Sequence, residues 1–555
     1  YNKANTTGDY NFGLSSTGAG LGMTASFAGA INFASTASTF TTQNNATAKF
    51  YILVDAFTST NPGITTFYCS STAQCGANTQ NFALTGDIDA TTFTTTGAAA
   101  GSKYANMRAL GTNSVAYSGI FAGLGHSITG LSLTGTSNVG LFQNTGNGAV
   151  IRDVRLSAAT ISGGTNTGAL VGTANSSLTM SNVVMDAVTG VNTISSNNNY
   201  LGALVGNAGA GTLSNIYVLN TNVSGTSYVG GVMGGTSMTA TNVHKVGSVT
   251  ATGISVGGAF GAMSGTLSNV DSVGSVTVTG SNYNVGGLIG DAGSSNITNA
   301  FATGAVTANS SYQVGGLLGY HGGGSLTNVA SSGGNISGTS SVGGLVGWYG
   351  SGTITTASTT GNVSGTTNVG GLVGYSSSTA NITGASTTGT VTGTANYVGG
   401  LVGQMYTGNS TVSNSFATGN VQGTYGVGGL VGYMDLNYTR TIDQNSYAQG
   451  TVVGTATGNG YVGGLVGKVS STGEVTDSYA TGKVNGSTLN MAERLRYAAK
   501  ALTAHGDDRL AGLFVLLLRD RLDVVADQTD RALRLNGDAV VQRVACHVQN
   551  STRGI

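Results

Sequence analysis

The sequence is poor in proline, charge and cysteine. A single proline (Pro62) occurs in 555 residues, and Asp, Glu, Lys and Arg together make up 7% of the chain, against about 25% in an average soluble domain. Because 39% of the residues are apolar and the formal net charge is zero, a folded chain is favoured over a disordered one. The zero net charge gives no basic footprint for nucleic acid. No apolar run approaches the roughly 18 residues that span a bilayer, which predicts no membrane-spanning segment.

The few cysteines leave little room for disulfide or metal chemistry. Cys69 and Cys75 bracket a short loop, where they either form a disulfide in an oxidising compartment or are two unrelated thiols. No His or Cys lies at metal-ligand spacing from them, so we expect no metal site. The chain begins at Tyr1 without a methionine or a signal-like apolar segment, which fits either a removed leader or a fragment.

Glycine, by contrast, is abundant and follows a long period. The 93 glycines show no G-X-Y repeat, which excludes collagen. A block of the form Val-Gly-Gly-Leu-Val-Gly recurs with small variations, in steps of 27 to 35 residues. Its last glycine falls at Gly172, Gly206, Gly234, Gly261, Gly290, Gly319, Gly347, Gly374, Gly403, Gly432 and Gly467. Such regular spacing indicates a stacked array of structural repeats.

Each repeat contains three short apolar pieces that are typical of strands. In one repeat they are the glycine block at 398–403 and the segments at 411–419 and 421–424. Val, Thr and aromatic residues alternate with small polar ones, and Gly or Asn stands between the pieces. Three strands in a repeat of nearly constant length predict an all-β fold, a right-handed parallel β-helix (solenoid) with coils about 4.8 Å apart. Proline would remove a hydrogen-bond donor from this ladder, which explains its scarcity.

Alternation within the block predicts which side chains face the core. If the block is one straight strand, Val398 and Val402 point inward and the leucine between them points outward. A leucine stripe would then form a possible assembly surface along the solenoid, at Leu345, Leu372, Leu401, Leu430 and Leu465. The alternative is a bend in the strand that buries both sides.

The composition divides the chain into three parts. Residues 1–82 lack the repeat and are expected to form an N-terminal capping region. Residues 83–486 make up the predicted solenoid. Residues 487–555 differ from everything before them, because the last 65 residues hold 10 of the 20 basic and 8 of the 20 acidic residues in a Leu/Val/Ala background. This pattern predicts a short α-helical tail, which is a C-terminal cap, a non-native stretch or a docking domain.

Residues suited to catalysis are few, and we predict no enzyme activity and no cofactor. Glycoside hydrolysis needs two carboxylates beside one bond, whereas most acidic residues before the tail lie singly in different repeats. Two pairs are exceptions: Asp87 with Asp89, and Asp435 with Asp443, which have Arg440 between them. The second pair leaves open a polysaccharide lyase or hydrolase, and each pair is otherwise a solvated feature of the surface.

Three other residues suggest roles that depend on their surroundings. His126 is expected to be a structural hydrogen-bonding residue. Tyr320 and Trp348 each follow a block glycine and are able to stack on sugar rings, although scattered surface aromatics are common. The glycine blocks themselves lack the Lys-Ser/Thr ending of a phosphate-binding loop.

The repeated Gly-Leu-Val-Gly blocks resemble the GLUG-motif repeats of large bacterial surface and secreted proteins. The wider setting is similar to filamentous-haemagglutinin-type adhesins, whose Asp-Ile-Asp and Phe-Asp-Gly-x-Gly-His-x-Ile segments are matched at 87–89 and 121–128, except that Ala122 replaces an aspartate. The resemblance covers about residues 83–486. It implies an extracellular or cell-surface, non-catalytic solenoid that acts as a bacterial adhesin or extracellular structural protein. The expected partners are cell-surface glycans or proteins, or copies of the chain itself in a fibre.

Overall fold

A computed structural model describes most of the repeat region and parts of the N-terminal region. The described residues are 2–3, 10–11, 14–17, 23–31, 39–42, 49–54, 79–91 and 116–486, the last range with gaps at 176, 188–189, 436–439, 457–459 and 470–472. Cys69, Cys75 and the tail at 487–555 lie outside the described residues. The disulfide and the helical tail therefore stay predictions.

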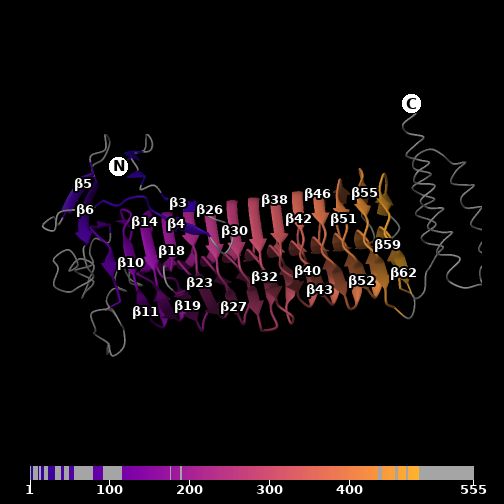
Figure 1. Cartoon of the computed structure of the whole chain (residues 1–555), viewed down its shortest axis with the longest axis horizontal. Helices are drawn as coiled ribbons and strands as arrows, with labels where there is room; N and C mark the ends of the chain where they lie inside the picture. Colours follow the sequence, from indigo (N-terminus) through magenta and orange to yellow (C-terminus); the bar gives the residue numbers. More distant parts are fainter. Residues whose placement is uncertain are drawn as a thin grey trace, which may run out of the picture.

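Within the described ranges the regular elements are all β-strands, and each coil from β14 to β49 contributes one strand to each of four sheets. In the later coils the strand of the largest sheet is split in two, as in β50 (Ser410–Ser413) and β51 (Phe416–Ala417). In a central coil the four strands are β38 (Ser325–Ser332), β39 (Ile336–Ser337), β40 (Ser340–Gly343) and β41 (Val346–Tyr349). We call the sheets that contain them sheets I, II, III and IV, which have 21, 13, 12 and 12 strands. Figure 1 shows equivalent strands side by side along the long axis, from the indigo N-terminal end to the orange last coils.

Successive coils pair in parallel and in register. β40 lies between β36 (Tyr312–Gly315) and β44 (Thr367–Gly370), and its Val342 is paired with Val314 and Val369. Equivalent residues of the repeats therefore form columns along the solenoid, one residue per coil and about 4.8 Å apart. The predicted parallel β-solenoid is confirmed.

The Val-Gly-Gly-Leu-Val-Gly block forms two strands rather than one. In the repeat at 342–347, β40 ends at Gly343 and β41 begins at Val346, so the chain turns between them. The turn directs Val342, Leu345 and Val346 all into the core, where each is completely buried. The prediction of three strands per coil is wrong, because the block crosses from one sheet to the next.

Of the two arrangements considered for the leucines, the structure shows the bend that buries both sides of the block, and the possible surface stripe is wrong. Leu345, Leu372, Leu401 and Leu430 are completely buried, and Leu465 is partly buried against the same core. The alternation argument assumed a straight strand, whereas the turn inside the block rotates the leucine inward. These leucines stabilise the solenoid by burial and offer no surface for assembly.

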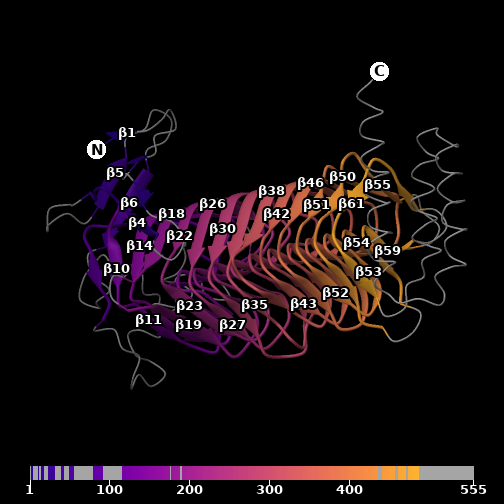
Figure 2. The ribbon, with the colours of Figure 1, turned by 45° about the vertical axis from the view of Figure 1, so that its right-hand side comes forward.

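The N-terminal residues both extend the solenoid and cover its side. β6 (Lys49–Val54) pairs in parallel with β7 (Asn81–Leu84) and antiparallel with β5 (Thr39–Thr42), which extends sheet I at its N-terminal end. A separate hairpin of β3 (Ser15–Thr17) and β4 (Thr24–Ser26) lies over the outer face of sheet I (Figure 2). Part of the N-terminal region thus lies along the flank of the coils.

Candidate binding surface

The last glycine of each block brings sheet IV against the backbone of the preceding coil. A Cβ atom on Gly347 would lie 2.5 Å from the backbone carbon of Gln313 and 2.5 Å from the nitrogen of Val314. All eleven predicted repeat glycines have such a backbone contact, and none has a positive φ. These glycines are therefore required for the close approach of two backbone segments rather than for an unusual conformation.

Two columns of side chains flank this contact on the outside of the solenoid. The first column, in sheet IV, consists of the residue directly after the last glycine of each block. The second consists of the residue directly before the first valine, which has a positive φ in most coils, as at Asn284 (63°) and Tyr397 (62°). The columns touch, because Asn284 Nδ2 donates to Asp291 Oδ2 (3.1 Å) and the Tyr397 ring stacks on Tyr433 (4.6 Å between centroids).

The first column changes character along the solenoid. Small and polar residues occupy it in the early coils: Thr173, Asn207, Gly235, Ala262 and Asp291. Aromatic residues dominate the next six coils, in the order Tyr320, Trp348, Tyr375, Gln404, Tyr433 and Lys468. Further aromatic residues lie beside them. We define the aromatic face as Tyr320, Trp348, Tyr375, Tyr397, Tyr406, Tyr425, Tyr433, Tyr461 and Lys468.

Short strands of two sheets hold the aromatic face. In sheet IV they are β37 (Leu318–His321), β41, β45 (Val373–Ser376), β49 (Val402–Met405), β54 (Val431–Met434) and β59 (Val466–Val469). In sheet III they are β48 (Asn396–Gly399), β53 (Tyr425–Gly428) and β58 (Val462–Gly463), which begins directly after Tyr461. Buried valines on these strands fix the backbone, so the rings are presented by a rigid support.

The rings of the first column pack edge to face. The Trp348 plane is inclined by 84° to Tyr320 and by 80° to Tyr375, with centroids 5.6 Å apart in both pairs. A three-ring column on sheet I instead stacks face to face, with interplanar angles of 4° and 9°: Phe416, Tyr447 and Tyr479. An edge-to-face pair leaves the face of one ring uncovered by its partner. The rings of Tyr320, Trp348 and Tyr375 therefore do not cover one another's faces as the rings of the sheet I column do.

One cation and one carboxylate lie at the C-terminal end of the aromatic face. Lys468 Nζ lies 5.3, 5.1 and 4.9 Å from the ring centroids of Tyr425, Tyr433 and Tyr461, respectively. Its hydrogen bond to Tyr425 Oη (3.0 Å) raises the pKa of Lys468, so the amine stays charged at neutral pH. Tyr433 Oη donates to Asp435 Oδ1 (2.8 Å). The face is thus close to electrically neutral.

A ladder of asparagines runs along the middle of sheet I. Each Asn side chain donates from Nδ2 to the side-chain oxygen of the equivalent residue in the preceding coil, at 2.7–3.1 Å. The ladder begins at Asp153 and continues through Asn182, Asn215, Asn242, Asn269, Asn299 and Asn328. All have positive φ between 52° and 57°, which asparagine tolerates better than most residues. The sequence analysis missed this ladder, although its spacing follows the repeat.

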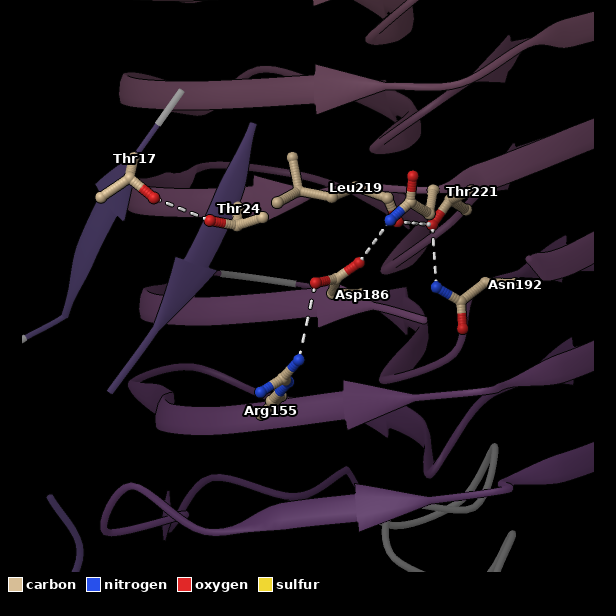
Figure 3. Close-up of polar contacts among 8 residues, drawn as sticks. Thr17, Thr24, Arg155, Asp186, Asn192, Leu219 and Thr221 are labelled. Carbon is tan, nitrogen blue, oxygen red and sulfur yellow. Dashed lines mark hydrogen bonds and ion pairs between the residues drawn. The ribbon is translucent and has the colours of Figure 1, made fainter. Parts of the chain in front are cut away.

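A second polar network lies beside the N-terminal hairpin (Figure 3). Asp186 forms an ion pair with Arg155 (3.5 Å) and accepts a hydrogen bond from Asn220 Nδ2 (2.8 Å). Buried Asn192 donates to Thr221 Oγ1 (3.1 Å). Under the hairpin, Ala25 packs in a small apolar cluster of sheet I residues: Val184, Leu219 and Val246. These contacts fix the hairpin and the coils, and their polar groups are used structurally.

Asp87, Asp89 and His126 lie at the N-terminal end of the solenoid, where each takes part in a local hydrogen bond. His126 is buried, and its Nε2 lies 2.8 Å from the Ile31 carbonyl oxygen. Asp87 accepts a hydrogen bond from the Ser127 amide (2.7 Å), and Asp89 accepts one from the Thr91 amide (2.9 Å). His126 is therefore a structural hydrogen-bonding residue, as predicted.

Asp435 and Asp443, the second carboxylate pair, were expected to flank an accessible Arg440, but this arginine lies in the core. Arg440 is completely buried, and its guanidinium donates to the carbonyl oxygens of Asp435 and Tyr406. Burial and the nearby charges of Asp477 and Glu474 raise the pKa of Asp443. Arg440 thus holds the backbone and is not offered to a surface substrate.

The described part of the chain contains neither a cluster of metal-binding side chains nor a membrane-spanning helix. No group of three or more His, Cys, Asp or Glu residues placed to hold a metal ion occurs there. In the same residues no helix is long and apolar enough to cross a membrane. The aromatic face is the feature best suited to contact a ligand, and only Tyr320 and Trp348 of its members were singled out in the sequence. Reading the residue after each block glycine also finds Tyr375, Tyr433 and Lys468, whereas Tyr397, Tyr406, Tyr425 and Tyr461 join the face only through the contacts between neighbouring strands.

The fold and its columns define a repeat protein of the parallel β-solenoid class. A family model of the GLUG motif matches the chain at residues 281–307, 394–422 and 458–485. The chain thus carries three GLUG motifs, and two of the matched segments contain residues of the aromatic face. Comparisons with curated proteins and with solved structures found no match.

Proposed function

We propose that this chain is a secreted or cell-surface bacterial adhesin without catalytic activity, which binds partners along its lateral surface. The observation that carries the proposal is the aromatic face, which continues over six successive coils of a regular solenoid. The same kind of contact is repeated from coil to coil, so one extended partner can make many weak interactions at once. Such multivalent binding strengthens attachment to the partner without a deep pocket. The GLUG motifs support an extracellular repeat protein.

The buried leucines weaken the alternative of a fibre subunit that assembles through a leucine stripe, since Leu345, Leu372, Leu401 and Leu430 are inaccessible. A non-catalytic role is favoured over a lyase or hydrolase because Arg440, which lies between Asp435 and Asp443 in the sequence, is completely buried. The partners proposed are glycans or proteins of neighbouring cells.

Surface display of the chain tests the proposal. Non-adherent bacteria that display it are expected to attach to cell layers or glycan-coated surfaces more than bacteria that display a variant with Trp348→Ala and Tyr375→Ala. Electron microscopy of the dilute purified protein is expected to show separate rods. Long regular polymers with no gain in attachment would instead establish the fibre subunit, and depolymerisation of a polysaccharide that is lost in Asp443→Asn would establish the enzyme.

A further inference from the structure

We propose that the aromatic face binds an extended, neutral, β-linked hexopyranose polysaccharide that lies parallel to the solenoid axis. This inference rests on the adhesive function proposed above and names the ligand class and the residues that contact it. The central contacts are made by Tyr320, Trp348 and Tyr375, whose rings occupy equivalent positions in three consecutive coils. The sugar rings place their apolar C–H faces against these aromatic rings.

The spacing of the rings matches an extended ligand. The first column advances by one residue per coil from Tyr320 to Lys468, which are five coil steps and about 24 Å apart. Successive sugar rings in an extended β-linked hexopyranose chain are separated by a distance close to that between coils. A polysaccharide along the axis therefore repeats its contact in each coil, whereas a helical α-linked chain curves away from a straight column.

The exposed surface of the aromatic rings is the source of the binding energy for a polysaccharide. Tyr320, Trp348 and Tyr375 are partly exposed, and Tyr406 at the edge of the face is 45% exposed. Because the rings are held by paired strands, little side-chain freedom is lost when a ligand binds. The hydroxyl groups of the partly exposed tyrosines provide donors and acceptors for sugar hydroxyl groups.

The charge of the face favours a neutral chain over an acidic one. Recognition of a polymer of uronic acids or sulfated sugars requires a row of cations, but Lys468 is the single cation of the aromatic face and is surrounded by three rings. Asp435, which accepts from Tyr433, adds a negative charge at the same end. An anionic polysaccharide would therefore gain little attraction here.

The sole tryptophan of the chain provides a direct reporter, since Trp348 lies in the middle of the face. Titration of the full chain with cellohexaose and with mannohexaose is expected to change the Trp348 fluorescence for at least one of them. Affinity electrophoresis in gels with hydroxyethyl cellulose or glucomannan is expected to retard the protein, whereas gels with amylopectin should not.

Variants separate binding from folding. Isothermal titration with the hexaose that binds is expected to show at least tenfold weaker binding for Trp348→Ala and for Tyr375→Ala, and near-normal binding for Trp348→Tyr. Phe301→Ala is the matched control, because Phe301 is an exposed aromatic residue (38%) of sheet I, outside the aromatic face. Circular dichroism checks that each variant keeps its β-structure.

Three results would overturn the inference: no binding of either hexaose or either β-linked polymer, equal loss in Phe301→Ala and Trp348→Ala, or a preference for an acidic polysaccharide. A dimer that sedimentation detects in the parent chain and not in Trp348→Ala, without glycan binding, would assign the face to self-association and also overturn it. If displayed cells still adhere while purified protein binds no glycan, the ligand assignment fails and the adhesive function stands.

Discussion

Lys245 is a charged residue type inside an apolar core, and its replacement should stabilise the protein. Its side chain is about 1% exposed, and its Nζ donates to the Gly247 carbonyl oxygen. In sheet I it is paired with Val218 and Ser272 of the adjacent coils. Among the described residues no carboxylate forms an ion pair with it. Burial lowers the pKa of Lys245 from 10.5 to about 7.

The pKa difference gives the size and sign of the effect. Between pH 7 and 10.5 the unfolded chain binds a proton at Lys245 that the folded chain does not, so stability falls as the pH is lowered through this range. At about 1.4 kcal/mol per pH unit, the cost at pH 7 is about 5 kcal/mol. Lys245→Met removes this cost but leaves the Gly247 carbonyl without its donor, which costs about 1–3 kcal/mol. We therefore expect a net gain of about 2–4 kcal/mol at pH 7.

Denaturant unfolding followed by circular dichroism, at several pH values between 6 and 11, measures this gain. The stability gain of Lys245→Met over the parent chain should be largest at and below pH 7 and should shrink as the pH rises. Near pH 10.5 it should reverse to a loss of about 1–3 kcal/mol, because only the missing hydrogen bond to Gly247 then remains. Titration of other groups cancels in the comparison. Lys483→Met is the control, because Lys483 is exposed and its removal should change stability by less than about 0.5 kcal/mol. A Lys245→Met variant that is less stable at pH 7, or whose gain does not depend on pH, would refute the reasoning.

Three further predictions concern the repeat architecture, and thermal unfolding measures each of them. Asn269→Ala should lower the free energy of unfolding by about 1–3 kcal/mol, because it breaks two ladder hydrogen bonds and imposes φ 56° on alanine. Asn269→Gly should lower it by less, since glycine accepts that φ. Equal losses of stability in the two variants would contradict the backbone argument. Gly347→Ala should prevent correct stacking of the coils, because its Cβ would meet the Gln313 backbone. Gly86→Ala has open space around the new Cβ and should leave the unfolding temperature unchanged. Leu401→Ala should lower the free energy of unfolding by about 2–5 kcal/mol, because it truncates a core side chain. A change near zero would instead indicate that the leucine lies on the surface.

The period of the glycine block was sufficient to predict the parallel solenoid, because backbone pairing between equivalent segments requires a nearly constant repeat length. The direction of the leucines was not predictable in the same way. Alternation identifies the faces of a straight strand, but the turn between Gly343 and Val346 places the two halves of the block in different sheets. Leu345 therefore faces the same core as the valines.

The candidate site was only partly visible in the sequence. Tyr320 and Trp348 stood out as aromatic residues after a block glycine, but their alignment with Tyr375 follows from the register of sheet IV. Tyr397 joins the face through a positive φ and its stacking on Tyr433, which no local pattern indicates. Contacts between columns depend on where neighbouring sheets meet, and a one-dimensional period carries no such information.

The parallel stacking has a mechanical consequence for a molecule pulled at its ends. The paired strands of successive coils lie side by side along the rod (Figure 1), so the hydrogen bonds between them run along its length. A pull in that direction loads the bonds of a terminal coil first and opens them in sequence rather than in shear. Each coil that detaches releases about 28 residues, which add roughly 90 Å of extended chain. Under tension the rod would lengthen step by step and lower the peak force, and in the adhesive function proposed above this would let a cell be displaced without an immediate break at its contact.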